Sequence, residues 1–135
     1  MPVFDELTLS GTTNTQNETW IRRLDTLRTS ATSAVTIATI AVATGTGLIL
    51  EPMLVGRETS SNAVWIESAA CIVYNNAGTL TLNLGLSTGV TTVWSNDISA
   101  FFFSFVISGT NLLIKITPHT ANQTDWEMLT DYMVV

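Results

Sequence analysis

Short apolar segments of period two dominate the chain from Val35 onward. In TLTLNLGL at 79–86 every second residue is leucine, as a strand with one buried face requires. The segment NLLIKIT at 111–117 alternates in the same way. Turn-forming clusters such as ATGTG, NNAG and SGTN separate these segments at intervals of about 8–12 residues. The pattern predicts an all-β, antiparallel β-sandwich or jelly-roll-like domain over residues 34–135, with essentially no helix.

The first 33 residues have a different character and predict an N-terminal arm. They are rich in Thr, Asn and Gly, and Thr15 to Glu18 match a helix capping box. Trp20, Leu24 and Leu27 then recur at helical spacing, which predicts a short helix over residues 16–28. The alternative is an extended arm that adds a strand to a neighbouring subunit.

Composition indicates that part of the surface is buried against other subunits. Of 135 residues, 46% are hydrophobic and only 12% are charged, about half the usual charged share. Phe101, Phe102 and Phe103 are consecutive, so strand alternation turns at least one ring away from the sandwich core. We therefore expect these residues at a subunit interface. The alternative is that loops or the arm cover this face.

The segment VGRET at 55–59 contains one of only five basic residues. Gly56 is expected to allow a bulge or a tight bend at a strand end. Arg57 would then reach a carboxylate or carbonyl groups of an adjacent subunit, which makes it a second candidate interface residue. The alternative is a solvated arginine in a turn. Either role is architectural.

Charge and hydropathy argue against nucleic-acid and membrane partners. A net charge of −6 disfavours phosphate binding, which depends on clustered Lys and Arg. No apolar run approaches the ~20 residues that a membrane-spanning helix needs. The N-terminus lacks the basic and apolar regions of a signal peptide. The single Cys71 is predicted to be a small buried hydrophobe, since one cysteine forms no intrachain disulfide.

The sequence shows no catalytic or cofactor-binding motif. The only histidine, His119, is expected to be exposed in a turn, because it has no cysteine or second histidine at metal-ligand spacing. The acidic residues are scattered, and no nucleophile elbow or phosphate-binding loop is present. We predict that the chain is not an enzyme and that it binds no metal or cofactor. Trp65, Trp94 and Trp126, with Tyr74 and Tyr132, could form a sugar platform, but aromatic residues in strands belong more often to cores and interfaces.

The order of short motifs resembles a β-domain that recurs in virion proteins of tailed bacteriophages, often at the C-terminal end of tail fibres and tailspikes. The resemblance spans residues 35–135. Its elements are Val35 to Val42 with the following TGTG turn, VGRET, NNAGTLTL at 75–82, SGTNLLIKIT at 108–117, and Thr124 to Trp126. The chain departs from this pattern at Ser60 and Ser61, where an acid is usual, and at Pro118, where a glycine is usual.

The resemblance implies a non-enzymatic structural protein of a phage virion, assembled in the cytoplasm of the host bacterium. A β-domain preceded only by an arm is the plan of a capsid decoration protein that binds and stabilises the shell. The alternatives are a short tail-fibre or tail-tip subunit and a module that binds host-surface carbohydrate. Resembling fibre domains are threefold, so we expect a homotrimer. Its partner would be the major capsid protein or another virion protein, bound through Phe4, Leu7, Leu9, Trp20, Ile21, Leu24 and Leu27.

Overall fold

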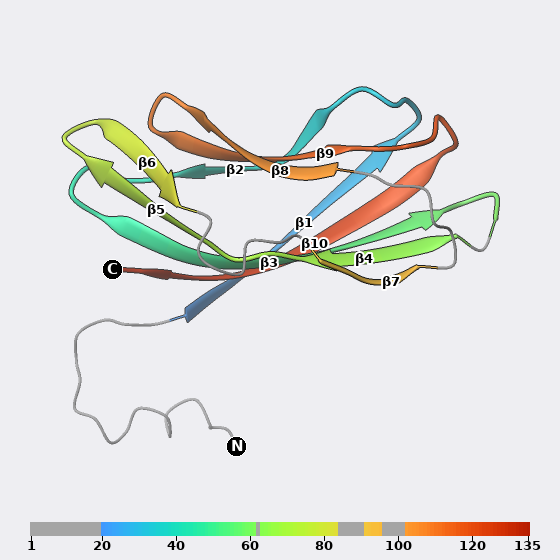
Figure 1. Cartoon of the computed structure of the whole chain (residues 1–135), viewed down its shortest axis with the longest axis horizontal. Coiled ribbons are helices and arrows are strands. Elements are labelled where there is room, and N and C mark those ends of the chain that lie inside the picture. The colour runs from blue at the N-terminus through green and yellow to red at the C-terminus, as the bar shows by residue number, and fades with distance from the viewer. Residues whose placement is uncertain (1–19, 62, 84–90, 96–101) are drawn as a thin grey trace, which may run out of the picture.

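The chain forms two antiparallel β-sheets packed face to face (Figure 1). The computed structural model describes residues 20–61, 63–83, 91–95 and 102–135, with the backbone alone for 91–95, 102 and 103. Within these residues all regular structure is strand, and none of it is helix. The predicted all-β fold with two antiparallel sheets is therefore confirmed.

Sheet A, the lower layer in Figure 1, has seven strands. They are β1 (Trp20–Thr29), β3 (Gly47–Glu58), β4 (Val64–Ser68), β5 (Cys71–Asn76), β6 (Thr79–Asn83), β7 (Thr91–Ser95) and β10 (Thr124–Val134). Strand β10 lies between β1 and the long strand β3. On its other side, β3 pairs with β4 near one end and with β5 near the other, and β7 and β6 continue outward from these two.

Sheet B, the upper layer, has three strands in the order β2 (Val35–Ala41), β9 (Asn111–Thr117) and β8 (Phe102–Ser108). Period-two alternation positions the core between the two sheets. Leu50 and Leu54 of β3 and Ile114 of β9 are completely buried. The residues between them in each strand point away from the core, so the periodicity of the sequence translates directly into the two-layer arrangement.

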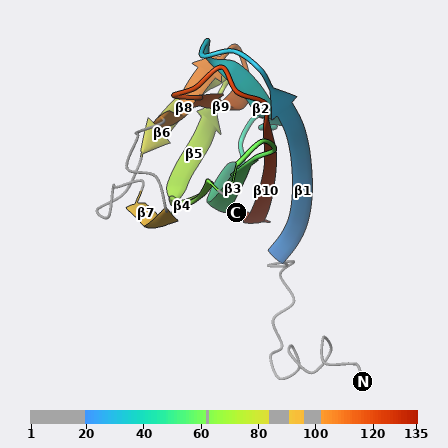
Figure 2. The same ribbon diagram turned by 90° about the vertical axis from the view of Figure 1, so that its right-hand side faces the viewer.

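The segment predicted as a helix is the edge strand β1. Residues 16–19 lie outside the described residues, but 20–29 pair with β10 along their whole length. The spacing of Trp20, Leu24 and Leu27 fits a helix, but an isolated helix this short is only marginally stable without packing against other elements. As a strand, the segment pairs with the backbone hydrogen-bonding groups along one edge of β10. Its outward side chains Arg22 and Arg28 each form an ion pair with a carboxylate of β10. The strand joins the chain's own sheet, and Figure 2 shows it curving toward β2.

Cys71 lies in the core, as predicted, and burial raises the pKa of its thiol to about 12. Because the thiolate is the reactive form, we expect no reaction with a thiol reagent at neutral pH while the protein is folded. Labelling should proceed only through unfolding, so its rate should increase with denaturant as the unfolded fraction does. The measurement is the rate of modification by a chromogenic disulfide reagent. Rapid labelling in native buffer would contradict the burial.

Candidate functional site

The motif VGRET meets the motif TDW where β3 pairs with β10. The register places Arg57 opposite Asp125, Gly56 opposite Trp126, and Glu58 opposite Thr124. Both motifs stand out in the sequence, but their pairing depends on a contact between distant segments. Two motifs that carry the resemblance to phage proteins therefore form one junction.

Gly56 provides space for Trp126, which corrects the expectation that this glycine bends the strand. Strand β3 continues through Gly56 without a shift in register. A Cβ at this position would lie 2.3 Å from Cζ3 of Trp126, so the indole ring lies directly against the glycine backbone. The ring of Trp65 stacks on Trp126 with centroids 6.0 Å apart. The junction is thus organised around one indole that is 1% exposed.

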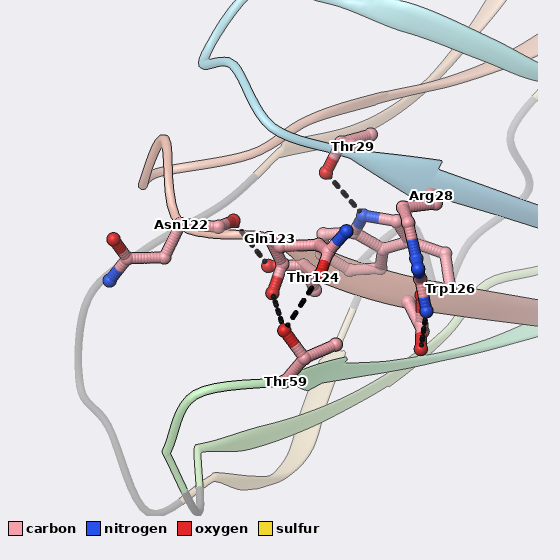
Figure 3. A network of polar contacts seen from close by, with 8 residues as sticks. Arg28, Thr29, Thr59, Asn122, Gln123, Thr124 and Trp126 are labelled. Atoms are coloured by element: carbon pink, nitrogen blue, oxygen red, sulfur yellow. Dashed lines mark hydrogen bonds and ion pairs between the residues drawn. The ribbon is translucent and has the colours of Figure 1, made fainter.

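The buried indole also ties β1 to β10. Its Nε1 donates a hydrogen bond of 2.9 Å to the hydroxyl of Thr29, the last residue of β1 (Figure 3). Thr29→Val should cost about 1–3 kcal/mol of stability, because it leaves a buried N–H without an acceptor. Thr29→Ser keeps the hydroxyl and is the matched control. Chemical denaturation of the three proteins measures the difference, and equal stability of Thr29→Val and wild type would show that this bond contributes nothing.

Glu58 and Thr59, the last two motif residues, hold the loop before β10. Glu58 is buried and accepts hydrogen bonds from Asn122 at 2.7 Å and from Ser60 at 3.3 Å. The backbone N–H of Thr59 donates to the carbonyl of Gln123 at 2.9 Å, and its hydroxyl donates to the side chain of Gln123 (Figure 3). Ser60, one of the departures from the phage pattern, therefore takes part in this loop contact.

Arg57 lies on the outer face of sheet A, in a row of alternating charge. Arg28 of β1 and Arg57 of β3 flank Asp125 of β10. The Nη2 of Arg28 donates to Asp125 Oδ2 at 2.9 Å. This hydrogen bond, together with the charges of both arginines, holds the pKa of Asp125 below its usual range. Within its own chain, Arg57 is therefore an exposed residue beside a carboxylate, and the predicted contact with an adjacent subunit remains a prediction.

A second charged row lies further along the same face. Arg22 makes two hydrogen bonds to Asp131, at 2.8 and 3.0 Å, and they lower the pKa of this carboxyl group. A carboxyl group with a lowered pKa is a poor general acid. Both outward aspartates of β10 are thus suited to ion pairing rather than to proton donation.

Strand β1 divides the predicted attachment residues between two faces. Trp20 and Leu24 point outward and are 48% and 61% exposed, whereas Leu27 packs against the core. Ile21 shares the inward parity of Leu27 but is 41% exposed. A helix would have grouped these side chains on one stripe, and the strand does not. Phe4, Leu7 and Leu9 lie outside the described residues.

Of the remaining aromatic candidates, the structure describes the side chains of Trp65, Tyr74, His119, Trp126 and Tyr132. Phe101 lies outside the described residues, and so do the side chains of Phe102 and Phe103 in β8. Trp65 and Trp126 are each 1% exposed, so neither forms a sugar platform. The side chain of Trp94 lies outside the described residues. His119 is half-buried, and its ring meets that of Trp65 edge to face at 4.9 Å, which corrects its expected exposure in a turn.

The described part of the chain offers no cluster of three or more His, Cys, Asp or Glu residues that could hold a metal ion. It also has no helix with the length and apolar character needed to cross a membrane.

Comparison with solved structures gives a match for this architecture. A tailspike protein of Acinetobacter baumannii phage AM24 superposes with a TM-score of 0.53 at 13% sequence identity, over 84% of this chain and 26% of that chain. The fold resembles a domain of a phage tailspike. A tailspike protein of A. baumannii bacteriophage Fri1, a capsular polysaccharide depolymerase, matches 86% of this chain and 19% of its own at 14% identity, with a TM-score of 0.42. No family description and no curated protein sequence matches the chain.

This likeness concerns a part of much larger proteins. The chain spans 26% of the AM24 tailspike and 19% of the Fri1 tailspike. At 13% identity the similarity to the AM24 tailspike shows the shared fold alone. The phage-type β-domain expected from the motif order is thus supported at the level of architecture.

Proposed function

We propose that this chain is a structural module of a tailed bacteriophage virion, with its place in a tail fibre or tailspike. The observation that carries the proposal is the two-sheet fold shared with the AM24 tailspike. The paired motifs VGRET and TDW add to it, because they join β3 and β10 in one architectural junction. A rigid sandwich with a long edge strand suits a protein whose task is to hold a shape.

The tail location replaces capsid decoration as the first candidate. The preference for decoration came from the short arm in front of the β-domain. The AM24 protein, whose fold this chain shares, is a tailspike and thus a tail protein. Attachment to another virion protein through the N-terminal region remains part of the proposal, with Trp20 as an exposed anchor at the start of β1.

A non-catalytic role is part of the same proposal. Glycoside hydrolysis needs one carboxyl group with a raised pKa to protonate the leaving group. On the outer face of sheet A, Asp125 and Asp131 both have lowered pKa values, because each is bonded to an arginine. Incubation of the purified chain with host capsular polysaccharide should release no reducing ends. Release of reducing ends would overturn this part of the proposal.

Copy number in the particle tests the location. Quantitative mass spectrometry of purified virions of the encoding phage should find this chain at the level of tail-fibre proteins. Immunogold labelling should mark the tail. Hundreds of copies per particle with label over the head would instead establish decoration of the capsid. Absence from the virion would overturn the proposal in both forms.

A homotrimer is proposed as the assembled state, because a charge-poor sandwich with an apolar outer surface needs partners. Light scattering of the purified chain gives the mass of the assembly directly. A dimer would contradict the threefold symmetry, but it would still agree with the burial of apolar surface between subunits.

A further inference from the structure

The outer face of sheet A is apolar across several strands. The register aligns Leu24 of β1, Leu129 of β10 and Met53 of β3 in one row across the sheet. A second row contains Trp20, Met133, Ile49 and Ile72. Leu24 is 61% exposed, and Met53 and Ile72 are 43% and 46% exposed. The charged row of Arg22, Asp131 and Glu51 lies between these two apolar rows, so apolar and charged rows alternate along the face. We call this whole face, with its apolar and charged rows, the patch; such a mixture of apolar and polar surface is typical of protein–protein interfaces.

The opposite surface of the sandwich has a more polar composition. The outer face of sheet B includes Thr36, Thr39, Ser104, Lys115 and Thr117, together with the partly exposed Leu113. Of the large apolar side chains described on this face, Val106 is the most exposed, at 39%, and the side chain of Phe102 lies outside the described residues. Among the described residues, more exposed apolar surface therefore lies on the outer face of sheet A than on that of sheet B.

The charges on this apolar face have both signs and nearly cancel. Three arginines and four carboxylates leave one negative charge: Arg22, Arg28, Arg57, Glu51, Asp125, Glu127 and Asp131. The face thus has three of the five basic residues of a chain whose net charge is −6. Nucleic acid or an anionic membrane would require a positive surface. A mixed, nearly neutral face can instead be buried against neighbouring copies around a symmetry axis, because charges of each sign can find their counterparts there.

The patch also has the size of a specific protein contact. Strands β1, β10 and β3, with β4 and β5 beside β3, give four strand widths. At ~4.8 Å per strand and ~3.3 Å per residue, ten residues of each cover roughly 600 Å² of flat area. Side-chain relief increases the accessible area, and a stable interface buries about 800 Å² on each partner. One sheet face is thus sufficient for a stable contact.

We infer that the outer face of sheet A is the contact surface between copies of this chain. The row of Leu24, Leu129 and Met53 crosses the middle of the contact, and the Arg28–Asp125–Arg57 row lies near one end. This inference rests on the proposed oligomer and names the surface that forms it. It also gives a reason for Arg57: Arg28 already pairs with Asp125, so the row has one net positive charge, and Arg57 can pair with a carboxylate of a neighbouring copy.

Three matched substitutions test the surface. Leu24→Glu and Met53→Glu each place a carboxylate in the middle apolar row of the patch. Val106→Glu introduces the same charge at an exposed apolar position on sheet B. In sedimentation velocity, wild type should form a defined oligomer, and both patch variants should raise its dissociation constant at least about tenfold. Val106→Glu should leave it unchanged. Slow labelling of Cys71 verifies that each variant is folded.

Peroxide oxidation provides a readout on the wild-type chain. The exposed Met53 should be oxidised more slowly in the concentrated oligomer than after dilution to monomer, while Met128, completely buried within the chain, serves as the reference. The inference is overturned if wild type is monomeric at micromolar concentration, if Val106→Glu disrupts the oligomer as strongly as Met53→Glu does, or if Met53 oxidation is equal in both states. A monomeric result leaves the virion location to be decided by copy number alone.

Discussion

Gly56→Ala should be strongly destabilising, although it adds a single methyl group. The new Cβ would lie 2.3 Å from Cζ3 and 2.6 Å from Cε3 of Trp126, closer than any relaxed contact. The indole has no space to retreat, because Trp65 stacks on it and its Nε1 is bonded to Thr29. Overpacking of this kind costs about 1–3 kcal/mol and more where the surroundings are rigid, so we expect ~3 kcal/mol or more. Denaturant titration of the variant against wild type measures the cost.

Gly45→Ala is the matched control, because it separates crowding from backbone strain. Gly45 has a φ of 80°, and a Cβ added there would have no atom within 4 Å, so only the backbone conformation resists a side chain. Its substitution should cost about 1 kcal/mol. A Gly56→Ala, Trp126→Leu double variant should be less destabilised than the sum of its single changes, because the smaller leucine side chain leaves room for the new Cβ at position 56. Additive effects would mean that the collision with Trp126 is not the cause.

The two-layer fold was predictable from the sequence because strand alternation is a local property. NLLIKIT reads as inward and outward residues without knowledge of its partner strands, and β9 has this alternation. The hairpin NNAGTLTL was predictable for a similar reason. Its two turn residues, Ala77 and Gly78, both have positive φ, as a tight hairpin between β5 and β6 requires.

Strand β1 shows where local patterns are insufficient. Trp20, Leu24 and Leu27 have helical spacing, but the segment is a strand because it pairs with β10, which lies more than 90 residues away in the sequence. Arg22 and Arg28 have the same parity, and this was the available signal for a strand with aspartates opposite. The role of Gly56 depends likewise on the register of β3 and β10, which no local pattern specifies. The two motifs of the candidate site could therefore be recognised in the sequence, but the contact between them could not be predicted from it.

Asn75 should be nearly as sensitive to substitution as Gly56, for an electrostatic reason. The side chain is completely buried at the end of β5. Its Nδ2 donates to the carbonyl of Val42 at 2.6 Å, and its Oδ1 accepts from the N–H of Gly78 at 2.8 Å, so it links the hairpin to the end of β2. Asn75→Leu would leave the carbonyl of the buried Val42 without its donor, at about 1–3 kcal/mol, and would remove the acceptor of the Gly78 N–H, which lies in an exposed turn. We expect a loss of about 2–3 kcal/mol in chemical denaturation.

Asn75→Asp distinguishes the lost hydrogen bonds from a change in shape, because the two side chains have nearly the same size. The aspartate can still accept from Gly78, but it can donate to the Val42 carbonyl only when protonated. Burial and the facing carbonyl oxygen both disfavour the carboxylate, so the pKa of this group should be raised in the folded state.

A group whose pKa is higher in the folded than in the unfolded protein stabilises the fold when it is protonated. This contribution is fully present below the unfolded pKa of about 3.9, and it is lost as the pH rises through the folded pKa. Relative to wild type, Asn75→Asp should therefore be least destabilised in acid and should lose stability toward neutral pH. Denaturation at several pH values measures this difference, and a difference independent of pH would show that the Val42 carbonyl does not need the donor.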